Sequence, residues 1–92
     1  MSVKTRDINK IFKKLKMVTE EGRDTLATLY YNGKPYIWTK VPHKKGDLKG
    51  KLPYFIRQQL EVDDDQFRNL IKCPLKLDGY IQILKEKNII QE

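Results

Sequence analysis

Residues 25–41 read TLATLYYNGKPYIWTKV, and this stretch decides the fold. Both halves contain Thr and Tyr, with Ile, Trp and Val in the second, as is typical of β-strands, and Asn32-Gly33 stands between them. Asn-Gly readily adopts the two positive φ angles of a type I′ turn. The stretch therefore predicts a β-hairpin with strands over 25–31 and 36–41. Alternation gives the first strand two faces, one with Ala27, Leu29 and Tyr31 and the other with Leu26, Thr28 and Tyr30.

A helix and a short strand are predicted before the hairpin. The helix follows from apolar residues that recur at the i, i+3, i+4, i+7 spacing of one face, namely Ile8, Ile11, Phe12 and Leu15. Thr5 supplies an N-cap, and Asp7 places an acid in the first turn. Met17 and Val18 then predict a short leading strand, which the sequence Glu20-Glu21-Gly22 brings to an end.

Three further helices are predicted after the hairpin. Pro53 suits the first turn of one, whose apolar side is formed by Leu48, Leu52, Phe55, Ile56 and Leu60. Asp63 and Gln66 match a capping box at the start of a short third helix. Asp78 favours the start of an extra C-terminal helix, expected over 76–90.

These elements predict an α+β fold of the order α-β-β-β-α-α-α. We expect a two-layer sandwich, in which a three-stranded antiparallel sheet carries helices on one face. The chain of 92 residues is long enough for one hydrophobic core and too short for two, so residues 1–92 are expected to form a single domain.

Composition excludes several classes of protein. One cysteine and one histidine cannot form an intramolecular disulfide or a standard zinc site. The acidic run Asp63-Asp64-Asp65 suits a helix start and lacks the spaced oxygen ligands of a calcium loop, so we expect neither metal nor cofactor. The first residues lack the apolar core of a signal peptide, and no apolar run is long enough to span a membrane. A cytoplasmic protein is expected.

Positive charge is concentrated in one part of the chain. Residues 1–57 hold 14 basic and 5 acidic residues, a net of +9, whereas residues 58–92 hold 5 basic and 7 acidic, a net of −2. The stretch 40–52, KVPHKKGDLKGKL, leads from a strand into a helix and places His43 among five lysines. Lysines and free backbone N–H groups at a helix start suit phosphate oxygens, which indicates an anionic polymer and favours RNA.

Two kinds of side chain are candidates for RNA contact. Phosphate contacts are expected from the lysines of the first helix and of the basic loop, namely Lys13, Lys14, Lys44, Lys45, Lys49 and Lys51. Trp38 and Tyr36, with Tyr30, would stack on bases if they are exposed. The alternative for these aromatic residues is cross-strand packing within the hairpin, which is the more common role.

Motifs in the second half of the chain resemble the HicA (YcfA-like) toxin family. The similar segments are Val41-Pro42-His43, Asp47-Leu48-Lys49-Gly50-Lys51-Leu52 and Val62-Asp63-Asp64-Asp65-Gln66-Phe67. The resemblance covers about residues 5–72 and leaves the helix over 76–90 unexplained. It implies the double-stranded RNA-binding type of fold, ribosome-independent cleavage of mRNA, and a HicB partner that neutralises the toxin.

The chain departs from this family at the proposed catalytic residue. HicA toxins carry the sequence Gly-Ser-His, and the simplest match here is Gly22-Arg23-Asp24, which puts Asp24 in place of the histidine. An alignment shifted to fit Tyr30 puts Ala27 there instead, and neither residue supplies an imidazole. A carboxylate with a pKa near ~3.9 is a weak base and no acid at neutral pH. His43 is the other catalytic candidate, although it stands on a different strand from the family's histidine.

Three functions follow from this reading. The favoured one is a HicA-like RNA-binding domain with impaired catalysis. The second is an active toxin-type ribonuclease that uses His43 as general acid or base, with cations to stabilise the phosphorane. The third is a protein-interaction module whose basic face binds an acidic, HicB-like antitoxin.

Overall fold

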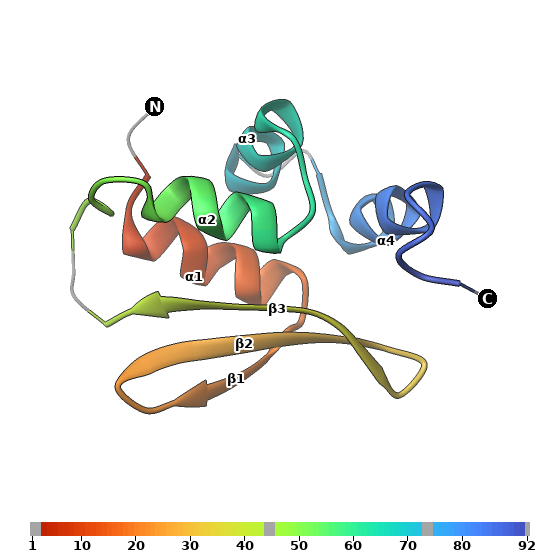
Figure 1. Ribbon diagram of the computed structural model, residues 1–92, viewed down its shortest axis with the longest axis horizontal. Helices are drawn as coiled ribbons and strands as arrows, with labels where there is room; N and C mark the ends of the chain where they lie inside the picture. The colour runs from red at the N-terminus through yellow and green to blue at the C-terminus, as the bar shows by residue number, and fades with distance from the viewer. Residues whose placement is uncertain (1–2, 44–45, 73–74, 92) are drawn as a thin grey trace.

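The computed structural model describes residues 3–43, 46–72 and 75–91. Its elements are α1 (Thr5–Lys14), β1 (Val18–Glu21), β2 (Asp24–Tyr31), β3 (Lys34–Pro42), α2 (Leu52–Gln59), α3 (Asp64–Lys72) and α4 (Leu77–Glu86). The strands form one antiparallel sheet in the order β1-β2-β3, and α1 and α2 lie on one of its faces (Figure 1). The predicted α+β class and the order of elements are confirmed.

The predicted hairpin is confirmed in detail. Tyr31 pairs with Lys34, and the two residues between them have φ angles of 52° at Asn32 and 79° at Gly33, as a type I′ turn requires. A β-bulge follows near the turn, because Leu29 pairs with Ile37 but Tyr30 pairs with Pro35. Tyr36 is therefore the extra residue on β3.

The core lies between the sheet and the helices. Every residue of the predicted apolar face of α1 is buried, and these side chains pack with Ala27, Leu29, Ile37 and Val41 of the sheet. Burial of each large aliphatic side chain contributes about 1.5–3 kcal/mol, so each residue packed in this interface stabilises the fold. Thr39 is also buried, and its hydroxyl donates to Oε1 of Gln59 in α2, which satisfies a polar group inside the interface.

Three element boundaries differ from their predictions. The helix α1 begins at Thr5 with Lys4 as N-cap, and the Asp7 carboxylate accepts a hydrogen bond from the Lys4 backbone N–H. The strand β1 continues through Glu21, because Glu21 pairs with Thr25 on β2. Leu48 precedes α2, since it pairs with the chain before α1 and does not join the helix.

The burial predicted for Phe55 is wrong. Ile56 and Leu60 face the core, whereas the Phe55 side chain is half exposed beside Tyr54. By contrast, the Asp63 capping box is confirmed, because the Gln66 backbone N–H donates to Asp63 Oδ1 and the Asp63 N–H donates to Gln66 Oε1.

The C-terminal helix is shorter than the predicted 76–90, because α4 ends at Glu86. Asn88 has a φ of 61°, which turns the backbone out of the helix, and the Ile89 N–H then donates to Leu84 O. Ile90 folds back into the core.

The Tyr80 side chain anchors α4 to the rest of the fold. It is fully buried, and its hydroxyl donates to Leu60 O over 2.6 Å. Burial raises the pKa of the Tyr80 phenol above its usual value, and the nearby charge of Glu61 adds to this effect. The phenol is thus held neutral, with a hydrogen-bond partner, where α4 meets the end of α2.

We expect Tyr80→Phe to lower the free energy of unfolding by about 1–3 kcal/mol, because it leaves the buried Leu60 carbonyl without its donor. Urea titration would measure the loss. Above pH ~10 the unfolded phenol ionises while the folded one stays protonated, so wild-type stability falls. Tyr80→Phe lacks this phenol, so the difference in unfolding free energy between wild type and the variant should narrow above that pH. Equal unfolding free energies at pH 7 would contradict the assigned hydrogen bond, and Tyr30→Phe, at an exposed position, is the control.

Candidate nucleic-acid interface

The connection from β3 to α2 is held against the start of α1. The Thr5 N–H donates to Gly46 O over 3.0 Å, and the Leu48 N–H donates to Val3 O over 2.8 Å. These bonds flank a bridge between Lys4 and Asp47. As a result, Lys4 and Arg6 from the start of α1 line one hollow with His43 and Gly46.

His43 lies at this end, directly after β3. Its Nε2 atom is 3.0 Å from Gly22 O and 3.2 Å from Glu21 Oε2, and its side chain is 46% exposed. Glu21 Oε2 also accepts a hydrogen bond from the Thr25 hydroxyl over 3.1 Å. The end of β1 and the turn after it therefore fix the position of the imidazole ring.

These contacts determine which imidazole nitrogen carries the proton. A carbonyl oxygen and a carboxylate can only accept, so Nε2 must donate. In the neutral imidazole, Nδ1 is then left with a free lone pair. His43 is thus oriented as a base or hydrogen-bond acceptor through Nδ1, and as a cation it would pair with Glu21.

Two hollows adjoin His43, and we call the residues that line them the His43 corner. One hollow, of about 360 Å³, is lined by Asn9, Phe12, Lys13, Met17, Thr19, Glu21, Thr25 and His43. The other, of about 440 Å³, is lined by Lys4, Thr5, Arg6, Asn9, His43 and Gly46. Both share Asn9 and His43, so one ligand could reach cations on either side of the imidazole.

The structure assigns the predicted lysines to different roles. Lys13 is exposed and lines the first hollow, whereas Lys49 and Lys51 are exposed in the segment before α2. Lys14 instead donates through Nζ to Leu70 O over 2.6 Å, and so joins α1 to the last turn of α3. Lys44 and Lys45 lie outside the described residues.

The other predicted site residues, Trp38, Tyr36 and Asp24, lie in different environments. Trp38 is exposed on the sheet face opposite the helices, while Tyr36 is partly buried, with its ring edge-to-face 6.4 Å from that of Tyr31. Asp24 pairs with Pro42 at the start of β2. Alternation puts its side chain on the face opposite Thr25, so the carboxylate that contacts His43 is Glu21.

Sequence reasoning missed several residues of the His43 corner, namely Lys4, Arg6, Asn9 and Glu21. Glu21 was assigned to a break between elements. Extending β1 by two residues would have placed it opposite Thr25 and near the end of β3. For Lys4 and Arg6 the sequence offers no comparable signal, because their position depends on pairing with a segment about 40 residues away.

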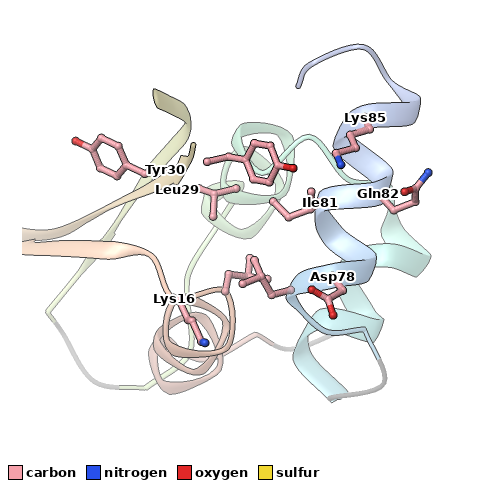
Figure 2. Close-up of a pocket in the computed structure, with 10 residues that line it drawn as sticks. Lys16, Leu29, Tyr30, Asp78, Ile81, Gln82 and Lys85 are labelled. Atoms are coloured by element: carbon pink, nitrogen blue, oxygen red, sulfur yellow. The ribbon is translucent and has the colours of Figure 1, made fainter. Parts of the chain in front are cut away.

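Another hollow, of about 450 Å³, separates the hairpin from α4 (Figure 2). Leu29 and Ile81 point toward one another across it, and Lys85 lies with Nζ 5.3 Å from the centre of the Tyr31 ring. Lys16 and Asp78 add opposite charges at its rim. Its floor is apolar and its charges are mixed, so it suits phosphate less well than the His43 corner does.

The described residues form neither a group of metal ligands nor a membrane-length helix. Within residues 3–43, 46–72 and 75–91, no three potential metal-binding side chains come together, and no helix is long and apolar enough to cross a membrane.

Comparisons with protein-family models, curated proteins and solved structures each found no match. The resemblance to HicA toxins therefore rests on the sequence motifs and stays a prediction.

Lys13 and Lys14 provide a matched pair that separates a structural lysine from a free surface one. We expect Lys14→Met to lower the free energy of unfolding by about 1–2 kcal/mol, because the charge-assisted bond to Leu70 O is removed. Lys13→Met should stay within about 0.5 kcal/mol of wild type, as for most surface substitutions. Urea unfolding of both variants measures the difference, and equal values would show that the Lys14 bond contributes nothing.

Proposed function

We propose that the protein is a HicA-like RNA-binding domain that holds phosphates at the His43 corner and the adjoining lysines. The observation that supports this most is the pairing of residues 3–5 with residues 46–48, which places Lys4 and Arg6 around one hollow with His43. Lysine and arginine that neutralise phosphates release bound counterions, and this release supplies much of the affinity for nucleic acids.

The charge distribution supports the same proposal. The net charge of +9 within residues 1–57 belongs to the part of the chain that forms α1, the sheet and the start of α2. Residues 58–92, with a net charge of −2, form the end of α2 together with α3 and α4. A polyanion would therefore approach from the side of α1 and the basic loop.

We expect the variant with Lys13, Lys49 and Lys51 all changed to Ala to bind labelled structured RNA more weakly than wild type. The slope of log affinity against log salt should become shallower by roughly 0.7–0.9 for each phosphate that the variant no longer neutralises. Fluorescence anisotropy at several salt concentrations gives both values. Lys72→Ala, at an exposed lysine on α3, is the control. An unchanged slope in the triple variant would place the RNA elsewhere, and absence of binding by wild type at low salt would refute the proposal.

A second candidate is ribonuclease activity through His43, favoured by the contacts of its Nε2 with Gly22 O and Glu21. With Nε2 protonated, Nδ1 could take the proton of a ribose 2′-hydroxyl as that oxygen attacks the adjacent phosphorus. The P–O5′ bond then breaks and the 5′-oxygen takes a proton from solvent water, while nearby cations such as Lys13 would stabilise the phosphorane. Asp24 does not share this arrangement, so catalysis would depend on a different residue from the family's histidine.

His43→Ala separates binding from catalysis. If His43 is the base, the variant should lose cleavage by about 10²-fold or more while RNA affinity changes little. Glu21→Gln should reduce cleavage less, because the Gly22 carbonyl still orients the ring. Gel analysis of labelled RNA gives the rates. Intact RNA after incubation with wild type would leave RNA binding as the function, and equal cleavage by His43→Ala would point to a contaminating nuclease.

A further inference from the structure

The sheet has one face that no described helix covers. The helices α1 and α2 lie on the opposite face, and α4 lies beside the hairpin end (Figure 1). Strand pairing aligns Val18 with Thr28 and Thr28 with Trp38, so these side chains form one row across all three strands. The side chains of Val18 and Trp38 are 54% and 57% exposed.

Tyr30 extends this apolar surface toward the hairpin turn. It is 49% exposed, and in Figure 2 its ring points away from the hollow between the hairpin and α4. Tyr36 differs, because the bulge places it where its ring meets Tyr31. We call Val18, Thr28, Tyr30 and Trp38 the open face. Contiguous exposed apolar groups are a feature of binding surfaces.

The charges around the open face favour bases over phosphates on it. The four residues that define it are uncharged, and the next row contains Glu20, Leu26 and Lys40, in which one acid balances one base. Lys40 is two residues from Trp38 on the same side of β3. A phosphate next to a stacked base could therefore reach Lys40 without entering the apolar row.

Position links the open face to the His43 corner. From Trp38 the strand β3 continues to its end at Pro42, directly before His43, and the five steps from Trp38 to His43, at roughly 3.3 Å each, span about 16 Å. The His43 side chain contacts Glu21 on the helix side of the sheet, so one nucleic-acid strand would contact both surfaces by passing around the end of β3. Bases within a duplex are stacked on one another and expose only their edges, so a flat aromatic side chain can stack only on an unpaired base.

We propose that the RNA bound by this protein carries an unpaired segment whose bases stack on Trp38 and Tyr30 of the open face. This inference rests on the proposed RNA-binding function and specifies its ligand. The basic surface near His43 holds phosphates without regard to sequence, and the open face selects RNA with accessible bases. A blunt duplex would use the first surface and leave the second empty.

The test compares two RNAs that share one duplex made of two separate strands, one blunt at both ends and one with a single-stranded extension. The extended RNA should bind more tightly, and Trp38→Ala should remove about a five- to 150-fold advantage, which corresponds to about 1–3 kcal/mol for one stacked base. Trp38→Tyr should retain part of it, and Tyr30→Ala should remove part of it. Phe55→Ala, which truncates a half-exposed aromatic on the helix layer, is the matched control and should change nothing.

The protein also contains its own reporter, because Trp38 is the single tryptophan. Its fluorescence should be quenched by the extended RNA and unchanged by the blunt one. Equal affinity for both RNAs, with no quenching, would overturn this inference while leaving RNA binding intact. Absence of binding to either RNA at low salt would refute the proposed function itself. A Trp38 signal that depends on protein concentration without RNA would show that copies of the chain cover this face, and would also overturn the inference.

Discussion

Backbone pairing between Val3–Thr5 and Gly46–Leu48 is the constraint on which the candidate site depends. Two hydrogen bonds, Thr5 N–H to Gly46 O and Leu48 N–H to Val3 O, return the chain after β3 to the start of α1. The bond from Thr5 satisfies a donor that the start of α1 would otherwise leave to water. The same bonds place Lys4 and Arg6 around one hollow with His43, and a bound polyanion would relieve the repulsion between these cations.

The two faces of the sheet have different environments, because one packs into the core and the other is exposed. The inner face of the sheet is committed to the core through Ala27, Leu29, Ile37 and Val41. The outer face keeps Val18 and Trp38 exposed, although burial of such side chains would stabilise a protein. An uncovered face and a charged corner are therefore accessible at the same time. The C-terminal helix leaves this arrangement unchanged, because Tyr80 holds it against the end of α2.

Charged side chains of the same sign have different roles in this protein, and the groups that each one contacts distinguish these roles. Lys14 stabilises the last turn of α3, where a cation is favourable near free carbonyl groups. Lys13, next to it in sequence, lines a hollow beside His43. Likewise Glu21 orients the imidazole, whereas Asp24, three residues later, faces the opposite side of the sheet. Charge counts over a segment cannot separate such roles, since each depends on direction as well as type.

The sequence by itself determined those features that depend on neighbouring residues. The type I′ turn at Asn32-Gly33, the Asp63 capping box and the apolar face of α1 follow from local conformational preferences and periodicity. Only the tertiary structure decided that Glu21 contacts His43, that Lys14 is structural and that Phe55 stays exposed. These outcomes depend on which segments far apart in the chain become neighbours in space. Local conformational preferences do not determine those contacts.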